Sequence, residues 1–433
     1  MIELKSIITN FLNKKEVKNA GWLIAGRVIQ MVLSFVVGIF AARYLGPSNY
    51  GLINYGLAFV TFFSAFCNLG INSILVKEIV NSPNNSGKIL GTTCFLRILS
   101  SLFSTLLIGI IVWFIDYGEP LTFWVVILCA SSLVFQTGEI FNYWFQAQYK
   151  SKFTAITSLI AYVATSSYKI FLLVLHMDVR WFAFANTLDC IVYSIIIFYL
   201  YKKSGGPKLE VRLLVGKGLL KQSYHFILSS AMIAVYMQTD KLMLKQMLSE
   251  AEVGYYSIAN NLCNIWVFVL AAIIDSVNPT IFRLYDSKDY SRFTKTNKRL
   301  YCIVFYLSCF VSVCFLLLGK QVINILYGDA YLGSVGPVMV LTWYTAFSYL
   351  GVARNAWLVC KNAQKYLKYL YVAAAIINVA LNFYLIPLFG ATGAAIASLV
   401  TQIATSILLP MFFKETRENS KLMLQAILFI GVI

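Results

Sequence analysis

Long runs of apolar residues, interrupted at intervals by short polar stretches, dominate the 433 residues of this chain. A helix that crosses the hydrocarbon core of a bilayer needs about 20 apolar residues, and about twelve of the runs reach that length. The pattern therefore predicts an all-α polytopic membrane protein. The expected spans cover residues 21–43, 52–76, 89–115, 121–147, 153–176, 181–201, 222–247, 253–282, 299–318, 337–359, 368–389 and 393–413.

The loops between these spans alternate between rich and poor in Lys and Arg. Most of the 35 Lys and Arg residues fall in the N-terminal tail and in every second loop. The intervening loops and their edges hold only Arg43, Arg180, Lys245 and Lys320. Cytoplasmic loops of membrane proteins carry the excess of positive charge. We therefore expect the N-terminus, and the C-terminus with it, on the cytoplasmic side.

Composition agrees with this topology. Charged residues make up 12% of the chain and hydrophobic residues 59%, and the mean hydropathy of +0.74 is far from that of a soluble globular protein. The net charge of +17 lies on loops that face an anionic leaflet, so we expect contact with anionic membrane lipids and no nucleic-acid binding. The nine cysteines form no CxxC pair and are expected to be apolar packing residues, with no metal site and no cofactor.

The two ends of the chain differ from the spans. Met1 to Lys18 lacks the uninterrupted apolar core of a cleavable signal and is expected to form a short interfacial helix. Leu422 to Ile433 is apolar but too short to cross a bilayer. That segment is either an interfacial tail or part of a thirteenth span.

A central cytoplasmic stretch divides the chain into two halves. Residues 204–221 contain a Ser-Gly-Gly-Pro sequence and several cations, a composition typical of a linker. Six expected spans precede it and six follow, which predicts an N-lobe at residues 1–203 and a C-lobe at 222–433, related by an axis along the membrane normal. A faint repeat agrees, because Tyr50–Gly56 and Val253–Ala259 each place a glycine beside aromatic residues after the first span of their half.

Some charged residues fall inside the expected spans. A charge at the centre of a bilayer costs roughly 2.5–3.5 kcal/mol on insertion scales, so these residues should line a polar cavity or pair with one another. The cations are candidates for binding an anionic substrate, and the acids are candidates for coupling transport to protons or sodium ions. The cations are Arg27, Arg97, Lys169, Lys241 and Arg354, and the acids are Glu139, Asp189, Asp240 and Asp275.

Depth along the helices limits which of these charges can meet, at 1.5 Å of rise per residue. Arg27 has no obvious partner in its own half and is the strongest candidate for contacting an anionic substrate, while Asp240 is the strongest candidate for binding a coupling cation. The structural alternative is that the cations extend to the head groups or hold helices in register. The pairs at similar depth are Arg97–Glu139, Arg354–Asp275 and Lys169–Asp189.

Four motifs in order along the chain carry a family resemblance. They are Ala41–Gly51 after the first span, Trp144–Gln148 at the end of the fourth, Thr239–Lys241 followed by Glu252–Tyr256 around the exit of the seventh, and Asn382–Ala395 between the last two. Together they resemble the motifs of the polysaccharide-transporter family, the Wzx-type O-antigen flippases. An acid often stands in that family where this chain has Gln148.

The resemblance implies the multidrug/oligosaccharidyl-lipid/polysaccharide exporter superfamily, with a MATE-like fold of two six-helix lobes around a central cavity. It also implies a flippase that moves undecaprenyl-diphosphate-linked oligosaccharides, as for lipopolysaccharide O-antigen, from the cytoplasmic to the periplasmic leaflet of the bacterial inner membrane by alternating access. Association with the polysaccharide polymerase machinery would follow. An ion gradient or the membrane potential would drive transport, because the sequence has no GxxxxGK[ST] phosphate loop.

Other functions are compatible with a long, basic membrane protein. A multidrug or cation exporter of the same superfamily should prefer acids and aromatics to embedded cations, and a lipid II flippase usually carries two extra helices. A polytopic glycosyltransferase or O-antigen polymerase would need catalytic groups on a sizeable outer loop. The largest outer loop expected here, Gly319–Gly336, carries only Lys320 and Asp329. We therefore expect a transporter and not an enzyme.

Overall fold

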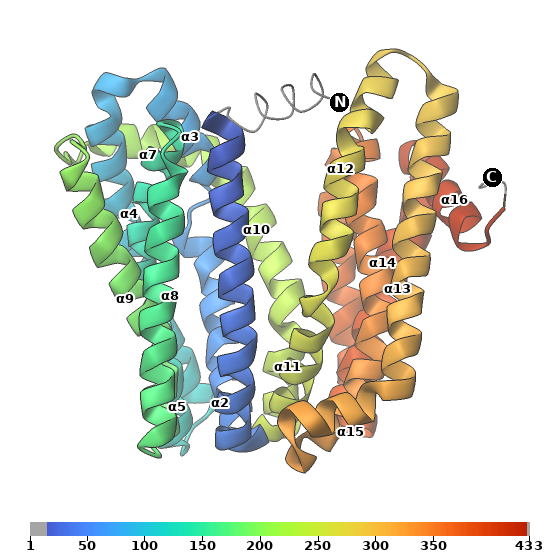
Figure 1. Ribbon diagram of the computed structural model, residues 1–433, viewed down its shortest axis with the longest axis horizontal. Coiled ribbons are helices and arrows are strands. Elements are labelled where there is room, and N and C mark those ends of the chain that lie inside the picture. Colours follow the sequence, from blue (N-terminus) through green and yellow to red (C-terminus); the bar gives the residue numbers. More distant parts are fainter. Residues whose placement is uncertain (1–14, 431–433) are drawn as a thin grey trace, which may run out of the picture. The chain divides into compact units, whose positions relative to one another are not determined.

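The computed structural model describes residues 15–430, and it describes side chains from residue 30 onward except those of Ser73, Leu228 and Ser229. Every regular element in this part of the chain is a helix, as the apolar pattern predicts (Figure 1). Nine helical stretches within it are long and apolar enough to cross a membrane. The chain is therefore an all-helical polytopic membrane protein. The interfacial helix expected near the N-terminus lies mostly outside the described residues.

Two of the nine stretches, Gln30–Cys67 and Gln364–Phe412, each cover most of two of the spans expected from the sequence. Each breaks at a glycine with positive φ, at Gly46 (φ 70°) and at Gly390 (φ 57°). Residues with a Cβ rarely adopt this conformation, whereas glycine does so readily. These glycines therefore end one span and begin the next at the positions where the hydrophobic pattern predicted short loops.

The described helices group into two compact units. Unit 1 comprises Met1–Leu45 and Gly56–Ala234, and unit 2 comprises Gly46–Tyr55 and Val235–Ile433. The helices α2 and α10 each contribute to both units. The helices of unit 1 are α2 (Lys15–Cys67), α3 (Asn72–Asn81), α4 (Ser86–Ile115), α5 (Pro120–Ala130), α6 (Ser132–Phe135), α7 (Ile140–Ala147), α8 (Ser151–Val174), α9 (Val179–Lys203) and the first part of α10 (Leu213–Met247), with the 3-10 turns η1 (Pro83–Asn85) and η2 (Gln136–Glu139).

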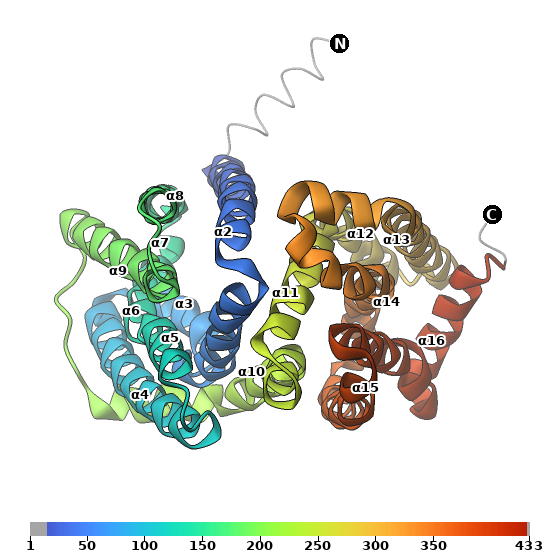
Figure 2. The same cartoon turned by 90° about the horizontal axis from the view of Figure 1, so that it is seen from below.

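Aromatic side chains fill the core of unit 1, in which α8 and α5 both pack against α9 (Figure 2). Trp144 and Phe145, from the motif at the end of the fourth expected span, are buried there, and Trp144 meets Tyr201 edge-on at 4.9 Å between ring centroids. Burial of such large side chains dominates core energetics. This motif is therefore a packing element of α7.

The expected linker folds back onto α4. A Cβ on Gly87 would lie 2.2 Å from the carbonyl oxygen of Lys208, so only glycine permits this approach. The backbone amide of Arg212 donates to Thr92 Oγ1 at 2.9 Å, and the Tyr201 hydroxyl donates to the carbonyl of Pro207 at 2.5 Å. The linker is therefore attached to unit 1 along much of its length.

Unit 2 begins with a short segment from the turn after Gly46. Its later part continues from α10 and contains one helix longer than expected, because α13 extends through residues that the sequence assigned to an outer loop after 318. The helices are α11 (Glu250–Ile265), α12 (Val267–Asp286), α13 (Tyr290–Tyr327), α14 (Val335–Cys360), α15 (Leu367–Ile403) and α16 (Lys414–Ile427), with the short turns η3 (Asp329–Ser334), η4 (Gln364–Tyr366), η5 (Ala404–Leu408, a π-helix) and η6 (Leu409–Phe412).

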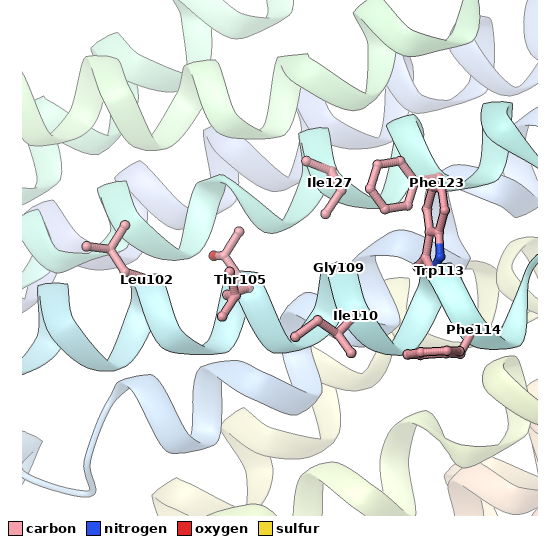
Figure 3. A pocket seen from close by; sticks show the side chains of 9 residues that line it. Leu102, Thr105, Gly109, Ile110, Trp113, Phe114, Phe123 and Ile127 are labelled. Atoms are coloured by element: carbon pink, nitrogen blue, oxygen red, sulfur yellow. The ribbon is translucent and has the colours of Figure 1, made fainter.

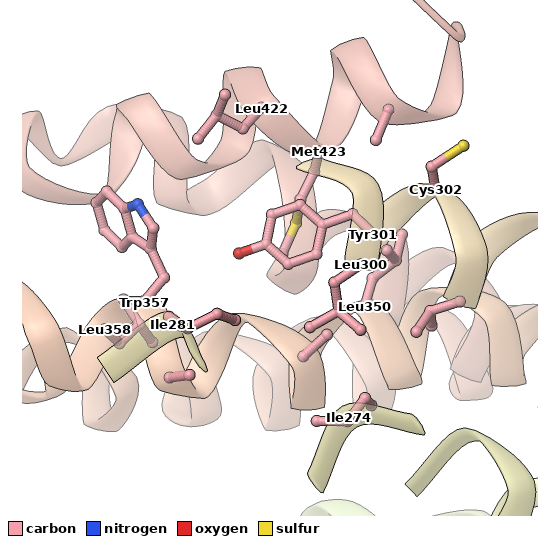
Figure 4. Packing of buried hydrophobic residues seen from close by; sticks show 14 of the residues in the cluster. Ile274, Ile281, Leu300, Tyr301, Cys302, Leu350, Trp357, Leu358, Leu422 and Met423 are labelled. Atoms are coloured by element: carbon pink, nitrogen blue, oxygen red, sulfur yellow. The ribbon is translucent and has the colours of Figure 1, made fainter. Parts of the chain in front are cut away.

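The short helix α16 completes the core of unit 2. Figure 4 shows Leu422 and Met423 of α16 beside Tyr301 of α13 and Trp357 of α14, all of them buried. Asn419 also donates its side-chain amide to the Tyr301 hydroxyl at 2.6 Å. The part of the apolar tail up to Ile427 therefore packs against unit 2 and does not form a separate span.

The two glycines of the faint repeat lie against each other within unit 2. A Cβ on Gly51 would lie 1.8 Å from the carbonyl oxygen of Glu250 and 2.7 Å from the backbone nitrogen of Gly254. A Cβ on Gly254 would lie 2.2 Å from the carbonyl oxygen of Pro47. Backbone therefore packs directly on backbone here, which explains why each repeat carries a glycine at this place.

Candidate functional site

The carboxylate of Asp240 on α10 is the centre of a buried polar cluster in unit 2. Asp240 is 3% exposed. Its Oδ1 accepts hydrogen bonds from the side-chain amides of Asn378 at 3.1 Å and Asn382 at 2.7 Å. Its Oδ2 accepts from the hydroxyls of Ser398 at 2.5 Å and of Tyr256. Both carboxylate oxygens therefore have two donors each.

Helix geometry brings Asp240 of α10 together with its partners on α11 and α15. Asn378 and Asn382 are four residues apart on α15 and so lie on one face of it. Ser398 lies beyond the break at Gly390, in the second part of α15, and the turn returns it to the same carboxylate. Tyr256 comes from α11, the helix that follows α10. The Asp240 cluster therefore depends on the glycine turn between the last two expected spans.

The chemistry of the Asp240 cluster suits a small hard cation. Hydroxyls and carboxamides can donate to a bare carboxylate, and by rotation they can instead present oxygen to a cation. Hard cations prefer carboxylate, carbonyl and hydroxyl oxygens. The side-chain oxygen of Asn382 is buried and has no hydrogen-bond partner, so an acceptor is already present within the cluster. The cluster can therefore hold either an ionised carboxylate or a carboxylate with a bound cation.

A chain of hydrogen bonds continues from the same helices to a π-helical turn. The Tyr236 hydroxyl, one turn before Asp240 on α10, donates to Gln402 Oε1 at 3.0 Å. Gln402 Nε2 then donates to Ser406 Oγ at 2.8 Å, within the π-helix η5. Such π-turns inside helices frequently occur at functional sites. These bonds therefore connect α10, one turn before Asp240, to the end of α15.

Arg354 on α14 holds this π-turn. Its side chain is buried, and Nη1 donates to the carbonyls of Thr405 at 3.1 Å and Ser406 at 3.3 Å. A π-turn leaves carbonyls without the usual helical partner, and a guanidinium supplies the missing donors. The pairing of Arg354 with Asp275 that helix depth allowed does not occur, because Asp275 is exposed on α12. The described contacts of Arg354 therefore stabilise the π-turn.

Replacing Arg354 by methionine is expected to lower the thermal unfolding midpoint of the purified protein. The loss leaves two buried carbonyls without their charged donor, a cost of about 1–3 kcal/mol. Lys320→Met is the matched control, since Lys320 is exposed on α13 and its loss removes the same charge. An unchanged midpoint in Arg354→Met together with failed transport would instead assign Arg354 to substrate binding.

Arg97 on α4 plays a comparable part in unit 1. Its side chain is 2% exposed, and Nη2 donates to Asn72 Oδ1 at 2.5 Å and to the carbonyl of Asn68 at 3.5 Å. These two asparagines flank the break between α2 and α3, so the hydrogen bonds of Arg97 stabilise the chain at that break. Its Nε and Nη1 are buried without a hydrogen-bond partner.

The charges expected to pair in unit 1 are neighbours without direct contact. Among the described residues, no ion pair joins Arg97 to Glu139 or Lys169 to Asp189. Each cation nevertheless attracts its expected partner electrostatically, Arg97 acting on Glu139 and Lys169 on Asp189. Asp189 accepts a hydrogen bond from Thr165 at 3.2 Å. The two carboxylates line one polar cavity in unit 1.

The remaining candidates are less informative about a site. The side chain of Arg27 lies outside the described part of the chain, and the structure establishes only that Arg27 belongs to α2. Lys241 is half-buried on α10 beside Asp240. Sequence reasoning selected Asp240 but missed its partners. Asn378 and Asn382, two amides four residues apart in an apolar run, were the signal that could have found them.

A larger hollow on unit 1 has a different character. It has a volume of about 550 Å³ between α4 and α5. Figure 3 shows the side chains of Leu102, Ile110, Trp113 and Phe123 lining it. Several of these side chains are exposed on the outer surface of α4, and Leu102 is 53% exposed. Its mostly apolar lining is what a lipid-facing groove requires, and it supplies no charged group for a polar substrate.

The fold is shared with solved membrane proteins. The chain is similar to an inward-facing multidrug resistance MATE family transporter of the MOP superfamily, at 14% identity over 92% of this chain and 96% of that one, with a TM-score of 0.70. It is equally similar to the lipid II flippase MurJ in an inward closed conformation, at 14% identity over 95% of this chain and 91% of that one, also with a TM-score of 0.70. It is therefore a multi-pass membrane protein with the MATE-like fold.

The chain belongs to the family described as "Polysaccharide biosynthesis protein", whose sequence profile matches residues 17–285. The MatE profile matches residues 226–385. A protein of Escherichia coli (strain K12) named "Putative O-antigen transporter" is 22% identical over 87% of this chain and 92% of its own length. The "Capsular polysaccharide biosynthesis protein CapF" of Staphylococcus aureus is 20% identical over 92% of this chain and 99% of its own length. The resemblance inferred from the four motifs is confirmed.

Proposed function

We propose that this protein flips undecaprenyl-diphosphate-linked oligosaccharide repeat units of a surface polysaccharide across a bacterial inner membrane. The direction is from the cytoplasmic to the periplasmic leaflet, with the N-terminus in the cytoplasm as the loop charges indicate. The diphosphate and sugars are too polar to cross hydrocarbon unaided, whereas the polyprenyl chain can stay in lipid. Membership of the family and the names of the two relatives support this substrate class.

The observation that carries the coupling mechanism is the buried Asp240 cluster. An intramembrane acid is costly and is a common relay for protons or sodium ions. Asp240 has four neutral donors and contacts α15 on both sides of its glycine turn. Binding of a cation would turn those donors and so change the contacts between α10, α11 and α15. In this proposal an ion gradient biases alternating access through these helices.

The charged residues within the spans help to choose between the proposed flippase and two alternative transporters. A multidrug exporter of the same superfamily remains the main alternative, because it would use the same fold. Arg97 and Arg354 hold helix breaks, so this distinction rests on Arg27, Lys169 and Lys241, which would repel a cationic drug and attract a diphosphate. A lipid II flippase is the nearer alternative, because its substrate carries the same kind of diphosphate lipid. The lipid-linked glycan that accumulates when the protein is absent distinguishes the polysaccharide flippase from the lipid II flippase. Loss of a multidrug exporter would cause no such accumulation.

The test is complementation of a strain that lacks its own polysaccharide flippase. Expression of this protein is expected to restore polymer at the cell surface and to lower the pool of lipid-linked repeat units, because it removes them from the cytoplasmic leaflet. The measurement is mass spectrometry of the lipid-linked glycans beside surface staining of the polymer. Raised resistance to cationic drugs with an unchanged glycan pool would instead support the multidrug alternative.

A further inference from the structure

Unit 1 contains a polar cavity of about 200 Å³ between helices. Its lining is unusual for the interior of an apolar bundle, because hydrogen-bonding side chains predominate in it. Two carboxylates, three carboxamides and two hydroxyls contribute, together with one phenyl ring and one thiol. The lining residues are Gln30, Phe135, Gln136, Glu139, Asn142, Ser158, Asp189, Cys190 and Tyr193.

The cavity forms where the fourth expected span departs from α-helix. Between α6 and α7 the chain makes the 3-10 turn η2, Gln136–Glu139. Side chains at i and i+3 eclipse in a 3-10 helix, so Gln136 and Glu139 point to the same side. Transporters commonly build binding sites near the bilayer midplane from interrupted helices of this kind. The interruption therefore supplies one wall of the cavity.

The helix α9 supplies the facing wall. Asp189 and Tyr193 are four residues apart and so lie on one face of α9. A Cβ on Gly138 would lie 2.1 Å from Ser194 Oγ, so glycine lets the 3-10 turn lie directly against α9. Ser194 Oγ also donates to the carbonyl of Phe135 at 2.5 Å, satisfying a backbone group that the interruption leaves open. Both walls are therefore held in place by specific contacts.

The size of the cavity suits a single ring. One water occupies roughly 30 Å³ of liquid, so the volume exceeds the need of a bare ion or a single water. It is also smaller than the roughly 300–1,000 Å³ of sites for drug-sized ligands. A ligand of one ring with its substituents fills this space, and a disaccharide does not.

The charge of the cavity suits a neutral ligand. Glu139 experiences the positive charge of Arg97, and Asp189 that of Lys169. Each carboxylate thus has one cation nearby outside the lining, which lowers the attraction that the lining offers to a free cation. The same carboxylates still offer strong acceptors to hydroxyl donors. Phe135 adds an apolar surface for the carbon face of a ring.

We propose that this cavity of unit 1 binds one neutral sugar ring of the oligosaccharide head group. The inference rests on the proposed function and deepens it, because it assigns sugar recognition to unit 1 while ion coupling depends on the Asp240 cluster of unit 2. The carboxylates accept hydrogen bonds from ring hydroxyls, and the carboxamides complete the set as donors and acceptors. Glu139 and Asp189 are thus sugar ligands rather than coupling acids.

The test is saturation-transfer NMR on the full-length protein in nanodiscs, with methyl glycosides as probes. The panel is methyl α-D-glucopyranoside, methyl α-D-galactopyranoside, methyl α-D-mannopyranoside and methyl N-acetyl-α-D-glucosaminide. At least one is expected to show saturation transfer, and Glu139→Gln and Asp189→Asn should weaken its binding by about five- to tenfold. Ser158→Leu, which fills the cavity and leaves both carboxylates in place, should abolish the signal. Asp275→Asn, exposed on α12, should leave it unchanged.

Two results would overturn this assignment. One is the absence of saturation transfer from all four glycosides with a protein that still restores polymer in cells, an outcome that leaves the proposed function intact. The other is a loss of sodium or pH dependence of transport in Glu139→Gln or Asp189→Asn with unchanged glycoside binding. That outcome would make the cavity an ion site, as the sequence first suggested.

Discussion

Asp240→Asn is expected to abolish the dependence of transport on the imposed sodium or proton gradient. Asparagine keeps the shape of the side chain but removes the charge that binds a cation or takes up a proton. Its amide nitrogen also faces donors that a carboxylate oxygen accepted, which leaves hydrogen bonds of the cluster unmade. We expect gradient-driven flux in proteoliposomes to fall at least about tenfold, equivalent to roughly 1.4 kcal/mol.

Asp286→Asn, at the last residue of α12, is the matched control for this experiment. It makes the same chemical change at an exposed position of α12, outside the Asp240 cluster, and its flux should follow the wild type at every gradient. Ser398→Ala should give an intermediate effect, because it removes one oxygen of the cluster and keeps the charge. A normal gradient response in Asp240→Asn would remove Asp240 from the coupling mechanism.

Gly254→Ala is expected to destabilise the fold strongly. The added Cβ would lie 2.2 Å from the carbonyl oxygen of Pro47, and no side-chain rotation can relieve a clash with backbone. Overpacking of this kind typically costs 1–3 kcal/mol, occasionally more. The thermal unfolding midpoint in detergent should fall, and the amount of folded protein recovered from membranes should fall with it.

Gly218→Ala provides the comparison for that substitution. Gly218 lies on α10, and nothing is within 4 Å of the Cβ that it would gain. Replacing glycine by alanine at an open helical position stabilises by about 0.5–1 kcal/mol, so the midpoint should stay or rise. Equal midpoints for Gly254→Ala and Gly218→Ala would contradict the close packing of the two repeat segments.

The sequence predicts the class of fold well because the bilayer imposes a simple rule on it. A run of about 20 apolar residues can only be a helix in hydrocarbon, so the existence of the spans follows from composition alone. The breaks at Gly46 and Gly390 were also foreseeable, since the pattern is interrupted there. The 3-10 turn at Gln136–Glu139 was not predicted, although the polar run Gln-Thr-Gly-Glu within an apolar span was a signal for it.

The sequence predicted the central residue of the candidate site but not the residues that bind it. Asp240 stood out because an acid in an apolar run is expensive. Asn378 and Ser398 did not, because neutral polar residues cost less and do not reveal which of them will face one carboxylate. The roles of the embedded cations were harder still to predict from the sequence. Arg97 and Arg354 bond to carbonyls and amides at helix irregularities, and those irregularities arise only in three dimensions.

The direct test of the proposed function is a measurement of leaflet exposure in proteoliposomes. A lipid-linked oligosaccharide placed in one leaflet is followed by its accessibility to a membrane-impermeant, sugar-modifying reagent on the other side. The account predicts rapid exposure that needs the protein, responds to the ion gradient and loses that response in Asp240→Asn. Exposure at the same slow rate with and without the protein, under every gradient, would contradict it.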